Sequence, residues 1–338
     1  MAFERPLSVL PGLADHQRRI DDALQAAVAT EEALMAQMGQ HLITAGGKRT
    51  RPLFAVASAA SLAPDEAGVA AAVTDDVIQG GVSVELVQVG SLCHDDVIDE
   101  ADSRRGVASV NLRWGNLKAI LAGDFLLAKA SEIAASLGTE VAGLLAATIA
   151  RLCEGEVHEL LHAYDVERTE ASYLQAIEGK TAALFATACR VGGIVGDLPR
   201  PIIENLTEFG RSYGMAFQIV DDVLDVVATD EELGKPAGHD IAEGVYTLPV
   251  LRAIEGRARG ELRSLLGRPI DGDELERARA LVRDSAGVAQ SVEVARGHVD
   301  DAVAALAPLG ETPGTAALLG AAHILVTEVE RRLIEPAT

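Results

Sequence analysis

The sequence predicts an all-α protein, built as a large single-domain helical bundle. Apolar residues recur at three- and four-residue spacing almost throughout, for example at Val82, Leu86, Val89 and Cys93, and this is the period of a helix. No segment alternates apolar and polar residues between hairpin signals, as strands would require. Alanine and leucine dominate, and aromatic residues make up only 3% of the chain. This composition also favours helix over strand.

Glycine and proline divide the chain into helix-sized pieces. The breaks lie, in chain order, at 46–47, 106, 138, 198–201, 234–238 and 308–314. We expect ten or more helices between them. No shift in composition marks a boundary, so we expect one domain over residues 1–338. About residues 1–15 are expected to form a poorly packed N-terminal segment.

The composition excludes several classes of partner. The formal net charge is −22, which argues against nucleic acid, because a phosphate backbone requires a basic surface. No apolar run approaches the roughly 18 residues that cross a bilayer, so we expect no transmembrane segment. The three cysteines are odd in number and lack metal or disulfide spacing, which favours a reduced, cytoplasmic protein.

A five-residue acidic motif occurs twice and is the strongest chemical signal. The segment 95–99 is Asp-Asp-Val-Ile-Asp, and the segment 221–225 is Asp-Asp-Val-Leu-Asp. On a helix, positions i and i+4 share a face, so the first and last aspartates of each copy lie together. Two carboxylates about 4 Å apart repel by roughly 4 kcal/mol at an effective dielectric near 20. Two such clusters facing each other would suit Mg²⁺ ions that hold a phosphorylated ligand.

An aspartate pair alone carries little information in so acidic a chain. The segment 75–79, Asp-Asp-Val-Ile-Gln, copies the motif except at its last position, and such pairs are common on solvated helix faces. The complete motif, twice, is much more specific than the pair.

Three clusters of polar and basic residues fit a diphosphate. Residues 46–52 place three cations at a joint between helices, where two glycines let the backbone approach a ligand. Arg104 and Arg105 follow the first acidic motif, and the segment 178–181, Glu-Gly-Lys-Thr, begins a largely apolar helix. Arginine binds phosphate oxygens in a fork, whereas lysine acts as a mobile point charge.

Together these segments resemble the trans-isoprenyl diphosphate synthases of the polyprenyl synthetase family, and the match is to a medium- or long-chain member. Order and spacing both fit. The matching segments are 46–52, 94–106, 179–181, 217–225 and 234–240. The resemblance implies an isoprenoid-synthase bundle around a central active-site cavity, a homodimer, and transfer of an allylic group to isopentenyl diphosphate.

The resemblance also assigns residues to three Mg²⁺ ions and two diphosphates. Metal ligands would be Asp95, Asp96, Asp99, Asp221, Asp225 and Asp240, with Asp222 close by. The allylic diphosphate would be held by Arg104, Lys180 and Lys235. Isopentenyl diphosphate, which needs no metal, would be held by Lys48, Arg51, Gln88 and Arg105. Thr181 and Gln218 would line the allylic cation.

In the family that the chain resembles, product length depends on residues one and two turns before the first aspartate. These are Gly90, Ser91, Val87 and Val84, none of them aromatic. An open tunnel predicts a product of roughly C30 to C50, with C20 as the alternative. Gly90 could instead permit close helix packing, in which case another helix or the dimer partner supplies the floor. Val245 stands where the family often has a lysine, which removes one contact to the allylic phosphate.

One motif competes with this interpretation. His158-Glu159-Leu160-Leu161-His162 fits the zinc-hydrolase pattern, with Glu159 as the candidate base and Glu178 as the nearest third ligand. A terpene cyclase would share the fold but would lack the second aspartate-rich motif. A non-catalytic synthase subunit would lack both motifs.

Overall fold

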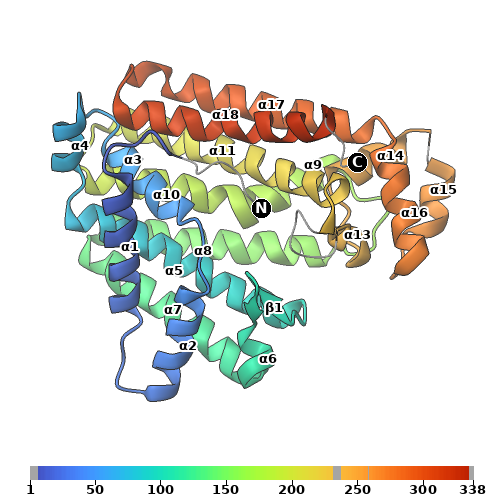
Figure 1. Cartoon of the computed structure of the whole chain (residues 1–338), viewed down its shortest axis with the longest axis horizontal. Helices are drawn as coiled ribbons and strands as arrows, with labels where there is room; N and C mark the ends of the chain where they lie inside the picture. Colours follow the sequence, from blue (N-terminus) through green and yellow to red (C-terminus); the bar gives the residue numbers. More distant parts are fainter. Residues whose placement is uncertain (1–6, 231–236, 258, 335–338) are drawn as a thin grey trace.

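The computed structural model describes residues 7–230, 237–257 and 259–334. The described chain is almost entirely helical, which confirms the predicted all-α class (Figure 1). The N-terminal half contains α1 (Leu13–Ala27), α2 (Ala33–Thr44), α3 (Thr50–Ala59), α4 (Glu66–Ala72), α5 (Asp75–Ile98), α6 (Val110–Trp114), α7 (Asn116–Ser136) and α8 (Thr139–Leu160). The C-terminal half contains α9 (Glu170–Ile177), η1 (Glu178–Ala182), α10 (Ala183–Val195), α11 (Arg200–Val227), α13 (His239–Ala242), α14 (Leu248–Glu255), α15 (Arg259–Leu265), α16 (Gly272–Arg283), α17 (Gly287–Leu306), η2 (Ala307–Leu309) and α18 (Pro313–Ile334).

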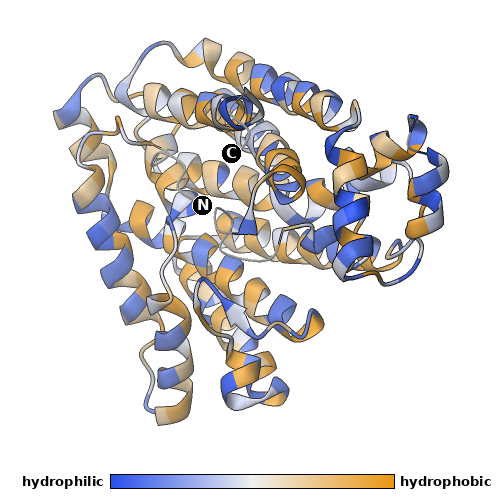
Figure 2. Ribbon diagram, turned by 45° about the vertical axis from the view of Figure 1, so that its right-hand side comes forward, coloured by the Kyte–Doolittle hydropathy of each residue, from blue (hydrophilic) through white to orange (hydrophobic). Residues whose placement is uncertain are grey.

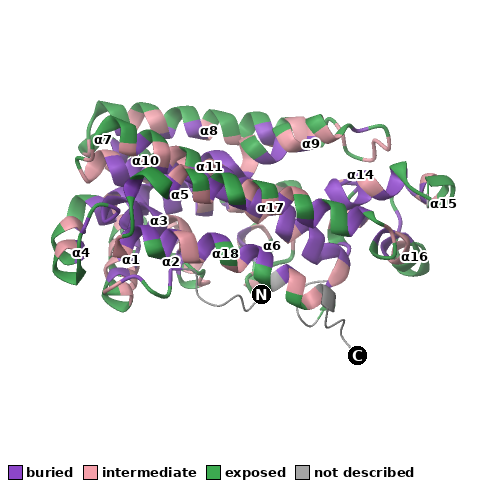
Figure 3. Ribbon diagram, turned by 90° about the horizontal axis from the view of Figure 1, so that it is seen from above, coloured by how far each residue is buried: buried purple, intermediate pink, exposed green. Residues whose placement is uncertain are grey.

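Two long helices, α5 and α11, organise the bundle. Helix α5 packs mainly against α7 and α3, and α11 packs mainly against α17 and α10. Their buried apolar side chains belong to one continuous core cluster. The outer faces of α7 and α8 are exposed (Figure 3), and hydrophilic and hydrophobic positions alternate around the surface helices (Figure 2). The core thus brings the two helices that carry the acidic motifs into one bundle.

The isolated aspartate pair Asp75-Asp76 lies at the start of α5. Thr74 caps this helix, because its Oγ1 accepts a hydrogen bond from the Val77 amide at 3.3 Å. Acidic residues in a first turn interact favourably with the positive end of the helix dipole. Asp75 also pairs with Arg19 at 2.8 Å. This pair therefore helps to begin the helix, whereas the complete motif Asp95–Asp99 ends it.

The described chain does contain two very short strands, which the sequence did not lead us to expect. β1 (Ser103–Arg104) pairs antiparallel with β2 (Val107–Ala108). The two residues between them, Arg105 and Gly106, both have positive φ, 54° and 79°. That pair of angles is typical of the tight hairpin turn that suits twisted strands. The hairpin is too short to show in the periodicity of the sequence.

The described part of the segment 1–15 is buried at two positions, although Ser8 and Val9 between them are exposed. Leu7 is 1% exposed and Leu10 is 3% exposed, and both belong to the main core cluster. Two leucines among polar residues give no periodic signal, so this docking depends on tertiary contacts. None of the described helices combines the length and the hydropathy that a bilayer crossing requires.

Candidate active site

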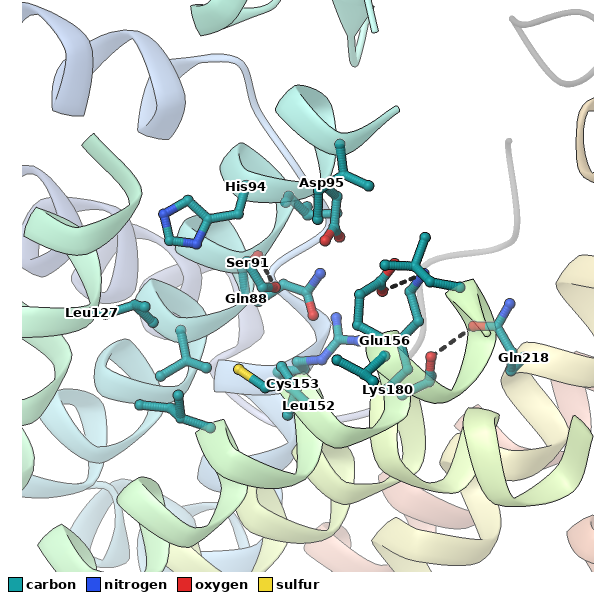
Figure 4. Close-up of a pocket in the computed structure, with 18 of the residues that line it drawn as sticks. Gln88, Ser91, His94, Asp95, Leu127, Leu152, Cys153, Glu156, Lys180 and Gln218 are labelled. Atoms are coloured by element: carbon teal, nitrogen blue, oxygen red, sulfur yellow. Dashed lines mark hydrogen bonds and ion pairs between the residues drawn. The ribbon is translucent and has the colours of Figure 1, made fainter. Parts of the chain in front are cut away.

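A cavity of about 520 Å³ lies between α5, α7, α8, η1 and α11, and we call it the main cavity (Figure 4). Its polar end holds Asp95, Lys180 and Gln218, whereas Leu127 and Leu152 lie toward the apolar end. Such a chamber suits an amphipathic ligand with a charged head and an apolar tail.

The first acidic motif occupies the C-terminal end of α5. Asp95 lines the main cavity, and burial raises the pKa of its carboxyl to about 7, although Lys180 opposes this shift. Asp96 is buried and accepts a hydrogen bond from Arg104 Nε at 2.6 Å. Burial still raises the Asp96 pKa, despite Arg104. Asp99 forms the C-cap of the helix. The negative end of the helix dipole adds to the repulsion among these carboxylates.

The second acidic motif lies within α11 and is held by hydrogen bonds. Asp222 is buried, and its two oxygens accept from Tyr173 Oη at 2.5 Å and Gln218 Nε2 at 2.8 Å. Gln218 Oε1 in turn accepts from Thr181 Oγ1 at 2.8 Å. Burial raises the Asp222 pKa to about 7, although both donors lower it. The chain of contacts fixes Thr181 and Gln218, as their predicted role beside a cation would require.

Asp221, Asp225 and Asp240 complete the acidic part of the site. Asp225 is buried and accepts a hydrogen bond from the Asp240 amide at 3.2 Å. Asp221 is more exposed and lies one residue before Asp222 on α11. Helix α13 therefore places Asp240 beside the second acidic motif. Lys235, the third cation expected at the allylic diphosphate, lies outside the described residues.

The two acidic motifs meet at a second, smaller cavity of about 150 Å³, which we call the small cavity. Asp99 reaches it from α5, Asp222 from α11 and Asp240 from α13. Three residues, Lys180, Thr181 and Gln218, line both cavities. Carboxylates from opposite helices thus face one space, as predicted. Val245 also lines the small cavity, where the family often has a lysine.

The oxygen ligands around the small cavity fit a hard divalent cation. Carboxylates are the ligands that Mg²⁺ prefers. Burial disfavours the charged form and raises the pKa of the Asp222 carboxyl, so positive charge nearby would stabilise this anion. The described residues contain no preformed group of three or more metal-ligating side chains. The oxygen donors around the small cavity are nevertheless of the kind that a hard divalent cation takes.

Two further carboxylates contact Lys180: Glu156, which the sequence analysis did not single out, and Glu159, which it named only as the candidate base of a zinc site. Lys180 Nζ contacts a Glu156 oxygen at 2.6 Å and a Glu159 oxygen at 2.7 Å. Burial would lower the Lys180 pKa, but the two glutamates together raise it above its ordinary value. Gly155 allows this approach, since a Cβ there would lie 2.6 Å from the Lys180 amide nitrogen. Lys180 is therefore fully charged and held by α8.

Lys180 belongs to η1, a π-helical turn between α9 and α10, not to the start of an ordinary helix as predicted. Such turns insert one residue into a helix and often occur at functional sites. Here the wider turn directs Lys180 and Thr181 toward both cavities.

Two of the four residues expected to hold isopentenyl diphosphate line the main cavity, and the other two do not. Arg51 and Gln88 line the main cavity. The Arg51 guanidinium lies 4.3 Å from the centroid of the Phe185 ring, and its buried Nε has no hydrogen-bond partner. Burial lowers the Arg51 pKa to about 10. Lys48 is exposed, and Arg105 donates to the Gly46 carbonyl. A buried guanidinium whose Nε has no hydrogen-bond partner among the described residues can donate to an anion.

The structure corrects part of the expectation for product length. Ser91 and Val87 line the main cavity, but Gly90 and Val84 are not among its lining residues. Gly90 lies against α7, where a Cβ would be 3.2 Å from the Gly123 carbonyl oxygen. Gly90 therefore permits close helix packing, which was the alternative interpretation. Its neighbours Ser91 and Val87 face the space into which a chain could grow.

The geometry contradicts the zinc-hydrolase alternative. His158 and His162 share a face, with ring centroids 4.8 Å apart, but His158 contacts Gln175 and Glu159 contacts Lys180. Glu178 lies 3.6 Å from Arg211. The candidate base thus points into the active site, away from the histidines. No set of three metal ligands forms here within the described part of the chain.

The fold and the site define an enzyme class, in which two facing acidic motifs lie beside an apolar chamber in a helical bundle. The family model described as polyprenyl synthetase matches residues 32–282. The chain belongs to the polyprenyl synthetase family and is a prenyl diphosphate synthase, a transferase, as the sequence analysis predicted.

Individual relatives match over nearly their full length. Nonaprenyl diphosphate synthase of Mycobacterium tuberculosis is 38% identical over 304 residues, which cover 89% of this chain and 88% of the relative. A short chain isoprenyl diphosphate synthase of Methanothermobacter thermautotrophicus is 38% identical over 288 residues, covering 81% and 84%. The structure of polyprenyl synthase from Caulobacter crescentus CB15, complexed with calcium and isoprenyl diphosphate, gives a TM-score of 0.87 at 33% identity, covering 96% and 98%.

Proposed function

We propose that the protein is a Mg²⁺-dependent synthase that condenses isopentenyl diphosphate with an allylic diphosphate, in a trans, head-to-tail 1′-4 reaction. The observation that carries this proposal is the junction of the two cavities. Carboxylates from both acidic motifs surround the small cavity, and Lys180, Thr181 and Gln218 connect it to the main cavity. The charged head of an allylic substrate would occupy the small cavity, and its apolar tail would occupy the main cavity.

Asp95, Asp96 and Asp99 on one side, and Asp221, Asp225 and Asp240 on the other, would hold three Mg²⁺ ions. When bound, the metal ions would neutralise charge that develops on the departing diphosphate. The calcium and isoprenyl diphosphate named in the structure of the Caulobacter relative support a divalent metal and a substrate of this class.

The cations on the acidic side would exchange partners when substrate binds. Arg104 now pairs with Asp96, and Lys180 pairs with Glu156 and Glu159. Both would contact the allylic diphosphate in the complex and stabilise it as the carbon–oxygen bond breaks. Thr181 and Gln218 present oriented dipoles beside the resulting allylic cation. Water is limited there by the apolar wall of the main cavity.

Isopentenyl diphosphate would bind on the basic side through Lys48, Arg51 and Arg105, with Gln88 at the cavity wall. Its double bond would attack the allylic cation, and the proton would leave to the released pyrophosphate. These reaction steps require no general base from the protein. Among the described residues that line the two cavities, the histidines are His94 and His239, and neither is needed as a base here.

We infer a product of C30 to C50 from the apolar end of the main cavity. Val87, Leu127, Ile149 and Leu152 line it, and Phe217 of α11 lies beside Gln218. The name of the mycobacterial relative supports a long product. The relative named short chain isoprenyl diphosphate synthase is equally identical, so the proposed length rests on the lining of the main cavity and not on overall identity.

We also propose a homodimer that packs through α7. Leu117, Ile120 and Leu121 are 80%, 41% and 56% exposed on this helix, which is unusual for neighbouring large apolar side chains. A second copy of the chain would cover them. The cytoplasmic location stays a prediction from the sequence.

The activity is tested by incubation with labelled isopentenyl diphosphate, Mg²⁺ and C5, C10, C15 or C20 allylic primers, with products sized by chromatography. We expect elongation beyond C20. Absence of any elongation would refute the proposed activity, and a product of C20 or shorter would refute only the proposed length.

Two neighbouring residues sharpen the test of length. Ser91→Phe should shorten the product, because the ring would enter the main cavity. Gly90→Tyr should instead lower the melting temperature, because its side chain would clash with the backbone of α7. A shortened product from a stable Gly90→Tyr variant would contradict our assignment of these two positions.

A further inference from the structure

Of the three cations in the segment 46–52, Arg51 lines the main cavity, whereas Lys48 and Arg49 do not. Arg49 is 6% exposed and begins α3 with a φ of 49°, a left-handed backbone that favours glycine. Its Nη2 donates to the Ile43 carbonyl at 2.7 Å, and its Nη1 donates to the Gly46 carbonyl at 3.2 Å. Its Nε donates to Asp21 on α1 at 2.9 Å. One guanidinium therefore joins α1, the end of α2 and the loop that carries Lys48.

A buried carboxylate lies beneath this loop. Glu85 on α5 is 3% exposed, and its Oε1 lies 3.4 Å from Arg49 Nη1. A buried carboxylate is costly unless cations surround it. Glu85 also interacts electrostatically with two further guanidiniums. Burial lowers the pKa of Arg51 and of Arg105, and the negative charge of Glu85 opposes this effect at both residues. One carboxylate thus stabilises the charge of three arginines.

The same loop is held from its other side by Arg105. Arg105 Nη1 donates to the Gly46 carbonyl, which therefore accepts from both Arg49 and Arg105. At Gly47 the backbone has a φ of 139°, and a Cβ there would lie 2.7 Å from Arg105 Nη1. The loop is thus fixed by two arginines before any ligand arrives.

We propose that Glu85 and Arg49 are positioning residues that preform the isopentenyl diphosphate site without touching the substrate. This inference rests on the proposed function, in which Lys48, Arg51 and Arg105 bind that diphosphate. Glu85 supplies the fixed counter-charge that lets three guanidiniums stay close together. Arg49 pairs with Glu85 and holds the loop 45–48 in place through its hydrogen bonds to the Ile43 and Gly46 carbonyls. The arrangement explains how a metal-free diphosphate site can persist when it is empty.

The test measures KM for each substrate in Glu85→Gln and Arg49→Lys variants. Each should raise KM for isopentenyl diphosphate about tenfold or more, because small misplacements of binding groups are costly. KM for the allylic substrate should stay within about twofold, since the acidic side has its own supports. A merely structural role would raise both KM values together or neither.

A double variant separates stability from positioning. Glu85→Gln with Arg49→Met removes both buried charges and should recover melting temperature lost in Glu85→Gln alone. It should not recover affinity for isopentenyl diphosphate. Asp21 is 48% exposed at its side chain, so Asp21→Asn should fold even if the others do not. Asp21→Asn should raise KM for isopentenyl diphosphate about two- to threefold and leave KM for the allylic substrate unchanged.

Arg51→Gln distinguishes failure of this inference from failure of the proposed function. If Arg51→Gln leaves KM for isopentenyl diphosphate unchanged, the proposed substrate site itself is wrong. If Arg51→Gln raises that KM but Glu85→Gln, Arg49→Lys and Asp21→Asn do not, the positioning role is wrong. We expect all of these variants to raise KM for isopentenyl diphosphate and to leave KM for the allylic substrate within about twofold.

Discussion

The two diphosphate sides of this site use opposite electrostatic arrangements. On the acidic side, Asp96 pairs with Arg104, and two glutamates pair with Lys180. On the basic side, Glu85 interacts with the guanidiniums of three arginines, and Asp21 pairs with one of them, Arg49. One side therefore carries excess negative charge and the other excess positive charge.

The difference explains why only one substrate would need metal. A diphosphate that approaches the acidic side meets cations already neutralised by the protein, so additional positive charge must come with it. A diphosphate that approaches the basic side meets a buried guanidinium without a hydrogen-bond partner at its Nε. Its affinity can come from the chain alone.

The largest expected effect is on the acidic side. Asp99→Ala and Asp222→Ala should each lower kcat/KM by about a thousandfold, the upper range for loss of one preorganised electrostatic contact. Asp75→Ala is the matched control, because Asp75 belongs to the incomplete copy of the motif and pairs with Arg19 at the protein surface. Steady-state kinetics with both substrates measures the effect. Equal losses in all three variants would contradict the special role of the complete motif.

A smaller effect is expected at Tyr173. Tyr173→Phe removes the hydroxyl that donates to Asp222 Oδ2, and a hydrogen bond to a charged group contributes about 1.5–3 kcal/mol. We expect kcat to fall roughly tenfold while KM for isopentenyl diphosphate stays unchanged. A rise in that KM would mean that the two sides are coupled through α11, contrary to our comparison.

Sequence reasoning located the acidic motifs from their spacing, whereas Gln88 and Thr181 were assigned by the resemblance to the family. Sequence reasoning missed Tyr173 and Glu156 and gave Glu159 another role, because these side chains meet their partners only through tertiary packing. Gly155 precedes Glu156, and Gly179 precedes Lys180. A pair of glycines in neighbouring helices allows close approach, so this pattern could have indicated the contact between Glu156 and Lys180.

The fold was predicted as a class but not in its details. Helical periodicity predicted the bundle, whereas the π-helical turn and the two-residue strands are too short for any period to reveal. The inward direction of Arg49 and the packing role of Gly90 depend on which helix lies opposite. Those contacts are properties of the assembled bundle, so the local sequence carries no signal for them.

The smallest expected effect is on stability as a function of pH. Burial raises the Asp222 pKa to about 7 in the folded protein, well above the value of an exposed aspartate. Between about pH 4 and 7 the folded state thus binds more protons than the unfolded chain, so this group's contribution to stability falls as pH rises. The gain in melting temperature on adding Mg²⁺ and pyrophosphate should be larger at pH 8 than at pH 6. Asp222→Asn should reduce that difference, and an equal gain at both pH values in the unmodified protein would argue against it.

The most direct test of the account is calorimetric titration of each substrate with and without metal. Isopentenyl diphosphate and an unreactive allylic thiolodiphosphate would be titrated in Mg²⁺ and again in excess chelator. We predict that chelation weakens binding of the allylic analogue about a hundredfold or more and changes binding of isopentenyl diphosphate by less than about threefold. Loss of both affinities, or of neither, would contradict the division into a metal-dependent acidic side and a preformed basic side.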